Sequence, residues 1–329
     1  MERKHTIWIT WEKHRRTESL ATRLNIPLYC FTCSLPRFLK HPWLLARTFL
    51  LLLCFRPRLL FVQNPSAFLT IEAILLKSFF RYILVVDAHN AGVYPFEKHQ
   101  DKFAKIFPFM HRYADLTVVT NSALSALIEK NGGHPFILPD PLPEFGSTPK
   151  TIKDQEGFIV TFICSFATDE PYLEVMKTVR YLPDDIRIYI TGNDSKLTES
   201  ERLQAGAGIV FTGFMEDGEF VQQLSNSDAI MDLTIFQDCL VCGAYEGVSL
   251  GVPLILSDTP ALRSWFYKGA VYTNGNAKDL ANAVLRVRAE RKSLIREVRL
   301  LRDEMSARWN DYFAKFQQVL HNMLHSRSR

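Results

Sequence analysis

The sequence has 329 residues, of which 47% are apolar and 22% are charged. This length is typical of two domains of roughly 150 residues each, and the composition excludes a disordered or fibrous chain. Six cysteines are too few for the disulfide framework of a small secreted protein, so we expect a reducing, cytoplasmic location.

The net charge of +4 is unevenly distributed along the chain. Residues 1–150 carry 19 basic and 11 acidic side chains, which gives 19 − 11 = +8, and residues 151–329 carry 20 and 24, which gives 20 − 24 = −4. A basic first half is typical of proteins that face anionic lipid, nucleic acid or a phosphorylated substrate. Because the basic residues are dispersed among leucines, without an aromatic stacking platform, we expect no nucleic-acid partner.

Strands and helices alternate throughout the chain. In the first half the apolar pattern predicts strands at residues 6–10, 58–64, 81–90 and 116–121, with a helix from Ser122 to the glycine pair 132–133. Residues 138–157 contain four prolines and are typical of a linker. Beyond them we predict helices near 173–181 and 219–225, a long charged helix over 277–302, and strands at residues 158–164, 186–192, 208–213, 229–234 and 253–258.

Continuous apolar strands between helices indicate parallel sheets that are covered on both faces. We therefore predict an α/β protein of two doubly wound parallel-sheet domains, over residues 1–143 and 158–308. The amphipathic final helix, 309–329, is predicted to pack back on the first domain.

The run "WLLARTFLLLLCF" at 43–55 is the most apolar part of the chain. Thirteen helical residues cover about 20 Å, less than the roughly 30 Å of a bilayer core, and Arg47 interrupts the run, so we do not expect a membrane span. A buried core helix and a helix lying in the membrane interface both remain open. The flanking basic residues favour an anionic membrane surface as partner: Arg37, Lys40, Arg56 and Arg58.

The segment "DCLVCGAYEGVSLGVPLIL", 238–256, holds two cysteines, two carboxylates and three glycines. A zinc site would need a second C-x-x-C about 15–20 residues away, whereas Cys30 and Cys33 lie about 200 residues upstream. A core segment would not explain the two carboxylates, which are seldom buried without partners. A loop through Gly243 into a helix that carries Glu246 would let backbone amides approach a phosphate at a helix N-terminus.

Asp238, seven residues, Glu246 and then Gly251-Val252-Pro253 resemble the E-x7-E signature of GT-B glycosyltransferases of the family 4 type. The resemblance implies two Rossmann-like domains that face a cleft, with a nucleotide-sugar donor in the second domain. It also implies that Glu246 holds the ribose hydroxyls, that Asp238 contacts the donor sugar, and that amides at Val241, Cys242 and Gly243 hold the diphosphate. "LLFVQNPSAFLT" and "LVVDAHNAGVYP" are similar to segments of the β-mannosyltransferases of dolichol-linked oligosaccharide assembly, which implies a lipid-linked or polysaccharide acceptor at the inner, cytoplasmic membrane face.

The first carboxylate is an aspartate, and the Arg and Lys that many family 4 members carry after the first strand of the second domain are absent. We therefore expect Arg16 to neutralise the donor diphosphate. No D-x-D pair is placed as a metal clamp, so basic side chains and helix dipoles are expected to do this work without a metal or another cofactor.

Ligands of open parallel sheets bind beyond the carboxyl ends of the strands. This rule adds Ser165, Gly192, Asn193 and Phe214 as donor-binding candidates. It also places His89 and Asp87 as catalytic candidates beside Asp238, and the candidates on the acceptor or membrane side are His14, Asn64, Asn90 and Arg47.

Two other functions fit the same sequence. A GT-B subunit that anchors or activates a partner would not need Glu246, and a nucleotide-sugar epimerase would not need the apolar, basic run at 43–55.

Overall fold

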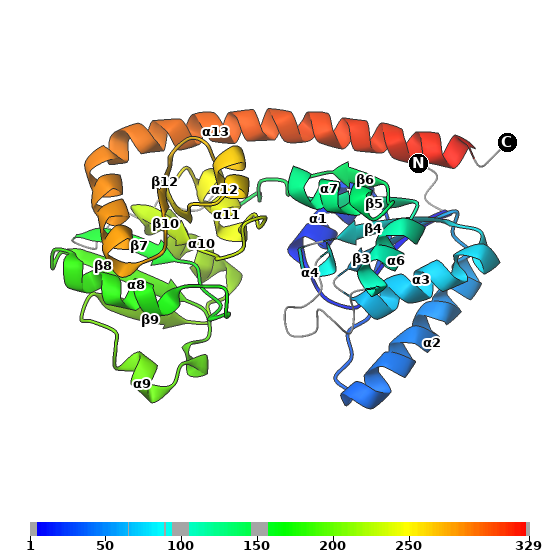
Figure 1. Ribbon diagram of the computed structural model, residues 1–329, viewed down its shortest axis with the longest axis horizontal. Helices are drawn as coiled ribbons and strands as arrows, with labels where there is room; N and C mark the ends of the chain where they lie inside the picture. The colour runs from blue at the N-terminus through cyan, green and yellow to red at the C-terminus, as the bar shows by residue number, and fades with distance from the viewer. Residues whose placement is uncertain (1–4, 65, 89, 94–104, 146–156, 327–329) are drawn as a thin grey trace. The chain divides into compact units, whose positions relative to one another are not determined.

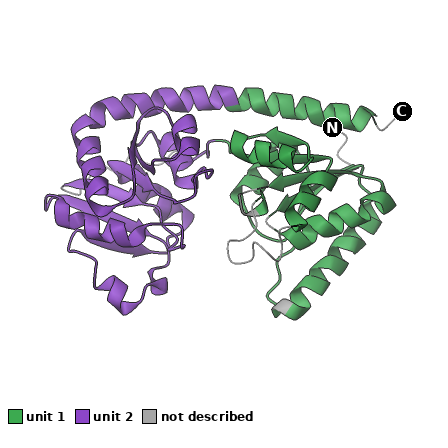
Figure 2. Ribbon diagram, viewed as in Figure 1, with its two compact units in different colours: residues 1–141, 309–329 green, residues 142–308 purple. Residues whose placement is uncertain are grey.

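The computed structural model describes residues 5–64, 66–88, 90–93, 105–145 and 157–326. The chain forms two compact units, which are coloured separately in Figure 2: unit 1 comprises residues 1–141 and 309–329, and unit 2 comprises residues 142–308. Each unit contains a six-stranded sheet whose paired strands are all parallel. The predicted α/β fold class, with two doubly wound sheets, is confirmed (Figure 1).

Unit 1 has the strand order β2-β1-β3-β4-β5-β6. Its strands are β1 (Thr6–Thr10), β2 (Leu28–Cys30), β3 (Leu59–Asn64), β4 (Ile83–Ala88), β5 (Leu116–Val119) and β6 (Pro135–Ile137). Its helices are α1 (Arg15–Leu24), α2 (Arg37–Phe55), α3 (Ala67–Phe80), α4 (Asn90–Val93), α6 (Ile106–Tyr113) and α7 (Ser122–Lys130).

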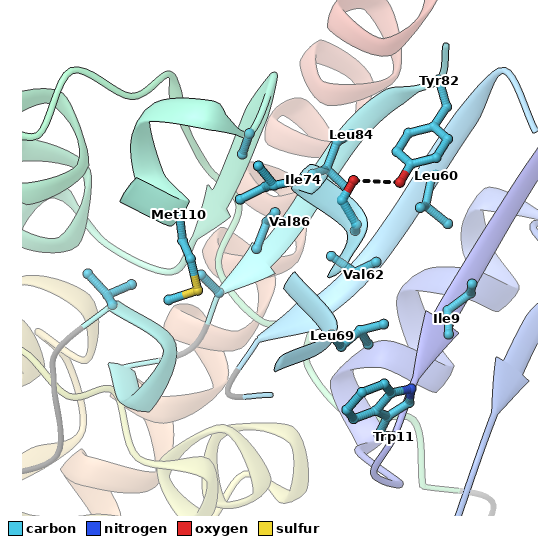
Figure 3. Packing of buried hydrophobic residues seen from close by; sticks show 14 of the residues in the cluster. Ile9, Trp11, Leu60, Val62, Leu69, Ile74, Tyr82, Leu84, Val86 and Met110 are labelled. Carbon is cyan, nitrogen blue, oxygen red and sulfur yellow. Dashed lines mark hydrogen bonds between the residues drawn. The ribbon is translucent and has the colours of Figure 1, made fainter. Parts of the chain in front are cut away.

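The sheet of unit 1 is buried on both faces. Successive residues of β3 alternate between two cores, with Leu60 and Val62 in one and Leu59 and Phe61 in the other. Figure 3 shows the first core, in which side chains of α3 pack on the strands and the Tyr82 hydroxyl donates to a backbone carbonyl of α3. Burial on both faces explains why these strands are continuously apolar in the sequence.

Unit 2 has the strand order β12-β11-β10-β7-β8-β9. Its strands are β7 (Phe158–Phe162), β8 (Ile186–Thr191), β9 (Ile209–Gly213), β10 (Ala229–Asp232), β11 (Leu254–Ser257) and β12 (Ala270–Thr273). Its helices are α8 (Tyr172–Thr178), α9 (Glu199–Arg202), α10 (Asp217–Asn226), α11 (Cys242–Leu250), α12 (Pro260–Trp265) and the first part of α13 (Ala277–Ser326).

The two helices predicted near the end of the chain are one helix, α13, of 50 residues. The residues between Arg302 and Trp309 include neither glycine nor proline, so nothing in the local sequence ends the helix. From Trp309 onward α13 belongs to unit 1, where Trp309, Phe316 and Leu320 are buried in the second core and the Trp309 indole donates to the Pro139 carbonyl at 2.9 Å.

Three short strands were not predicted, namely β2, β6 and β12. Each is an edge strand that is not buried throughout, so its apolar pattern is weaker than that of the interior strands. Cys30 is exposed at the end of β2, an edge strand of its sheet.

The length argument against a membrane span was wrong, because α2 has 19 residues and not 13. Phe38–Phe55 is long and apolar enough to cross a bilayer by length and composition alone, and only 17% of this window is buried in the protein. One stripe of α2 nevertheless belongs to unit 1. Leu44, Thr48 and Leu52 recur every four residues and are all 0% exposed, and the Trp11 indole donates to the Thr48 hydroxyl at 3.1 Å.

Glu72 on α3 provides a test of the unit 1 packing. Its Oε2 atom is buried without a hydrogen-bond partner among the described residues, and burial raises the pKa of this carboxyl to about 8. Because the pKa is higher in the folded than in the unfolded chain, the folded state retains the proton and loses stability as pH rises from about 4.5 to about 8.

We expect the melting temperature of the wild type to fall across this pH range and that of Glu72→Gln to fall less. Glu129→Gln, which changes an exposed carboxylate of α7 in the same unit, is the matched control and should follow the wild type. If the melting temperatures of the wild type and Glu72→Gln fell equally with rising pH, Glu72 would not be the group that causes the loss of stability.

Candidate functional site

The candidate site in unit 2 lies where the direction of the strand order reverses. The chain passes from β7 to β8 and β9 on one side, and from β10 to β11 and β12 on the other, so the reversal falls between the neighbouring strands β7 and β10. In open α/β sheets the loops that leave the carboxyl ends of two such strands diverge and leave a crevice for a ligand. We call the loops 164–170, 192–196 and 233–243 the switch-point site.

The loops after β7 and β10 are held together across this position. The Thr234 hydroxyl donates to the Asp169 carboxylate at 2.9 Å, and the amide of Ile235 donates to the Asp169 carbonyl at 3.0 Å. Both loops are therefore fixed to one another by side chains of unit 2 itself.

Asp232, at the end of β10, sets the position of helix α11. Its Oδ2 atom accepts the amide hydrogen of Gly243 at 2.7 Å, and the residue is only 7% exposed. Burial raises the pKa of Asp232 well above its usual value, although the hydrogen bond from Gly243 opposes the shift and the charge of Glu246 adds to it.

Gly243 is required by this close approach and not by an open ligand site. A Cβ atom there would lie 2.5 Å from Ile163 Cδ1 and 2.6 Å from Asp232 Oδ2. The amide that was predicted to hold a diphosphate is thus already bound to Asp232 in this structure. This part of the sequence interpretation needs correction, and Asp232 is the residue that it missed.

The remaining residues of the predicted signature lie around the start of α11. Val241 is the N-cap and makes no side-chain cap hydrogen bond, and Cys242 is the first helical residue and is exposed. Asp238 is half-buried in the preceding loop. Glu246 lies on α11 and is 7% exposed, so it is more deeply buried than a side chain facing an open cleft.

The loop after β7 binds a carboxylate of the protein. Glu170 accepts hydrogen bonds from the amides of Ser165 (2.9 and 3.1 Å to its two oxygens) and Ala167 (2.9 Å), and from the Ser165 hydroxyl at 3.0 Å. Phe166, between them, has a left-handed φ of 56°, and successive amides in such a turn form a concave anion-binding surface. The predicted donor residue Ser165 is therefore in an anion-binding loop, and Glu170 occupies it.

The loop after β8 contributes a cation to the same place. Gly192 has a φ of 90°, and a Cβ atom there would lie 2.1 Å from the Cys164 carbonyl oxygen, so only glycine allows the two loops to touch. Asn193 begins the short turn 194–196 by accepting the Ser195 amide at 3.1 Å. This turn carries Lys196, whose ammonium group donates to the Ser165 carbonyl at 2.6 Å.

Lys196 was not predicted from the sequence. Its position four residues after Gly192, beyond the carboxyl end of a parallel strand, could have identified it as a candidate. Phe214, which was predicted, follows β9 and is 82% exposed, a high value for an apolar side chain.

In unit 1 Arg16 is buried among groups of the protein. Its guanidinium donates to Asp87 Oδ1 at 3.0 Å, to the carboxylate of Asp140, and to the Leu138 carbonyl at 2.7 Å. Burial alone lowers the pKa of Arg16, but the charges of Asp87 and Asp140 more than offset this and raise it above its usual value. Arg16 and Asp87 therefore form an internal ion pair, whereas the sequence led us to expect Arg16 at the donor diphosphate and Asp87 as a catalytic residue.

The remaining predicted residues of unit 1 have separate positions. Asn64 is buried and its side-chain amide donates to the Gly92 carbonyl at 2.8 Å, so it fixes the segment after β4. His14 is the half-buried N-cap of α1, and Asn90 begins α4. Arg47 lies on α2 with its guanidinium 4.6 Å from the Phe31 ring. His89 lies outside the described residues.

No protein-family model and no curated protein sequence matches the chain. Solved structures match it over nearly its full length. HepE from Anabaena, in complex with UDP and glucose, has a TM-score of 0.74 at 12% identity and covers 96% of this chain and 100% of its own. Sucrose-phosphate synthase from Thermosynechococcus elongatus has a TM-score of 0.77 at 14% identity over 98% and 100%.

The trehalose 6-phosphate synthase of Burkholderia multivorans also matches, with a TM-score of 0.66 at 12% identity over 88% of this chain and 79% of its own. These likenesses establish the class of fold. The chain has the two-domain GT-B fold, in which each unit is a Rossmann-like domain.

Glu170 should matter for the stability of unit 2, because its carboxylate satisfies amides that have no helix or strand partner. In Glu170→Gln the NH₂ group of the new side chain faces donors, so we expect the free energy of unfolding to fall by about 1–3 kcal/mol. Urea unfolding measures this loss. Glu219→Gln, an exposed change on α10, is the control, and equal stability of both variants would show that the loop does not depend on the carboxylate.

Proposed function

We propose that this protein is a glycosyltransferase that uses a nucleotide-sugar donor, with UDP as the favoured nucleotide. The observation that carries the proposal is the switch-point site of a GT-B fold, where Glu246 lies in the N-terminal half of α11 and Asp238 precedes that helix. Support for UDP comes from HepE, which was solved in complex with UDP and with UDP-glucose.

In the proposed donor complex Glu246 accepts the ribose hydroxyls and the N-terminus of α11 faces the diphosphate. A helix N-terminus carries partial positive charge and is suited to an anion. The loop 192–196 supplies Lys196 as the cation that neutralises the diphosphate. Arg16 does not fill this role in the proposal, because its guanidinium is engaged in an internal ion pair. Phe214 is an exposed ring on which a nucleobase can stack.

This arrangement neutralises the leaving group with a lysine and a helix dipole, so we propose that transfer needs no divalent metal. Within the family 4 resemblance Asp238 contacts the donor sugar and His89 acts at the reacting centre. Asp87 is tied to Arg16, so we assign it the support of that buried ion pair.

We further propose that the acceptor is a lipid-linked glycan or a polysaccharide, and that the protein acts as a peripheral protein on the inner, cytoplasmic face of the membrane. The support is the resemblance of residues 59–70 and 84–95 to lipid-acceptor mannosyltransferases, together with the exposed apolar side chains of α2.

A nucleotide-sugar epimerase is the second candidate. A putative UDP-N-acetylglucosamine 2-epimerase from Listeria monocytogenes matches with a TM-score of 0.60 at 12% identity over 94% of this chain and 88% of its own. Incubation of the purified protein with labelled UDP-sugars separates the functions. Release of UDP supports transfer or its hydrolytic side reaction, a new epimer supports the alternative, and nucleotide binding without turnover supports a non-catalytic partner subunit.

Removal of the Glu246 charge should weaken UDP binding strongly. Two charge-assisted hydrogen bonds to ribose contribute about 1.5–3 kcal/mol each, so Glu246→Gln should cost roughly 2–4 kcal/mol after partial compensation, which is about 30- to 1000-fold in Kd. The glutamine keeps the volume of this buried side chain. Calorimetric titration measures the change.

The matched control is Cys242→Ser on the same helix, which should leave the Kd almost unchanged because the thiol is exposed and has no role in the proposed contact. If Cys242→Ser abolished binding while Glu246→Gln had no effect, the proposed donor site would be wrong.

Lys196 should contribute to binding through the diphosphate and not through the nucleoside. We therefore expect Lys196→Ala to weaken UDP binding about tenfold and to leave uridine binding unchanged. The difference in UDP affinity between the wild type and the variant should become smaller as the salt concentration increases. Lys177→Ala, which removes a half-exposed lysine of α8, is the control. An equal loss for UDP and uridine would show that Lys196 only maintains the loop.

A further inference from the structure

Helices α2 and α3 of unit 1 expose an unusual number of large apolar side chains. We name as the apolar band Phe38, Trp43, Leu50 and Leu53 of α2 with Leu75 and Phe79 of α3. Leu50 is 57% exposed, Leu75 is 68% exposed and Phe79 is 71% exposed. The two helices pack together, with the Phe49 and Phe80 rings 5.9 Å apart, so the band extends over both. Contiguous apolar surface of this kind marks a docking site.

The attachment of α2 to its own unit restricts what the band can do. The buried stripe at Leu44, Thr48 and Leu52 packs on the core, and Thr48 accepts a hydrogen bond from Trp11. A helix that crossed a bilayer would have to give up these contacts. The outward face of α2 is therefore suited to lie along an apolar surface while the helix stays docked.

The charges around the band are positive. Helix α2 contains Arg37, Lys40 and Arg47 and no carboxylate, and the only carboxylate of α3 is Glu72. Burial raises the pKa of Glu72 to about 8, so this group favours its neutral form at pH 7. Basic residues beside an apolar helix face are the charge pattern of helices that bind anionic membranes.

Two arginines end these helices in an unfavourable backbone conformation. Arg56 ends α2 with φ 42° and Arg81 ends α3 with φ 60°, positions at which glycine is normally preferred. A non-glycine residue in this conformation costs free energy relative to glycine.

Arg81 also lines a pocket of about 410 Å³ at the end of α3. Its other lining residues are Arg58, Lys77, Ser78, Ile83 and Leu324. Three of these lining side chains are basic, and one of them, Lys77, forms an ion pair with Asp115 at 2.7 Å. Guanidinium groups and a serine hydroxyl are suited to bind a phosphate.

We propose that the apolar band and this basic pocket together form the attachment surface for an anionic phospholipid bilayer. The band enters the boundary between headgroups and acyl chains, and the pocket binds a headgroup phosphate. The inference rests on the membrane attachment in the proposed function and assigns it to particular side chains, and it does not depend on sugar transfer or on the nucleotide site.

The test is flotation of the full chain with vesicles of phosphatidylcholine alone and with added phosphatidylglycerol. We expect binding only to the anionic vesicles, and weaker binding at high salt. The triple variant Leu50→Ser, Leu53→Ser, Phe79→Ser should reduce it at least tenfold. These positions avoid Leu52, which is fully buried, so that the core is left intact. Leu203→Ser and Leu300→Ser together, at exposed positions of unit 2, are the matched control.

The variant Arg81→Gly tests the contribution of the pocket to lipid binding without weakening the fold. Glycine suits the left-handed position, so the melting temperature should not fall, while the preference for anionic over neutral vesicles should shrink severalfold. Arg286→Gln, an exposed arginine of unit 2, should behave as the wild type. A thermal shift by UDP that is equal in all variants would show that unit 2 is unaffected.

Wild-type protein that stays unbound with anionic vesicles, or a triple variant that floats as the wild type does, would overturn the proposal. The same holds if the wild type is a dimer in sedimentation and the triple variant is a monomer, because the band would then be a contact between copies of the chain. If the protein bound free phosphate but not anionic vesicles, the pocket would be a site for soluble anions. That result would also contradict the proposal.

Discussion

The hydrogen bond from the Gly243 amide to Asp232 is the contact on which the candidate site depends. It joins the end of β10 to the first turn of α11 and brings the helix so close that residue 243 cannot carry a Cβ atom. The positions of Cys242 and Glu246 follow from it, because residues on one helix share its placement. Burial and the neighbouring charge of Glu246 raise the pKa of the Asp232 carboxyl, and the hydrogen bond from Gly243 opposes the shift.

The two units satisfy their charged side chains in different ways. Unit 1 places a guanidinium between two carboxylates, so that the charge of Arg16 is balanced inside the protein. Unit 2 instead satisfies Glu170 with backbone amides and leaves the ammonium of Lys196 beside the same loop. Because the charge of Arg16 is already balanced by two carboxylates, whereas Lys196 donates to a backbone carbonyl, the switch-point site is the better place for an anionic ligand.

Strand and helix alternation, the parallel arrangement and the two-sheet α/β class were predictable, because strands buried on both faces must be continuously apolar. The positions of the loops that form the candidate site were also predictable, since ligands lie beyond the carboxyl ends of parallel strands. The edge strands β2, β6 and β12 and the continuity of α13 were not, because an edge strand that is only partly buried has a weak apolar pattern and no residue type marks where a helix continues.

The sequence by itself determined which residue types lie at the switch-point loops, including Asp238, Glu246, Ser165 and Gly192. Only the tertiary structure decided which polar groups are already engaged. Arg16 and Asp87 are 71 positions apart, and the Gly243 amide and Asp232 are 11 apart, so no local pattern shows that they bind each other. Hydrogen bonds and ion pairs are made by groups that the folded chain brings within about 3 Å, and that proximity is a property of the packing and not of the sequence spacing.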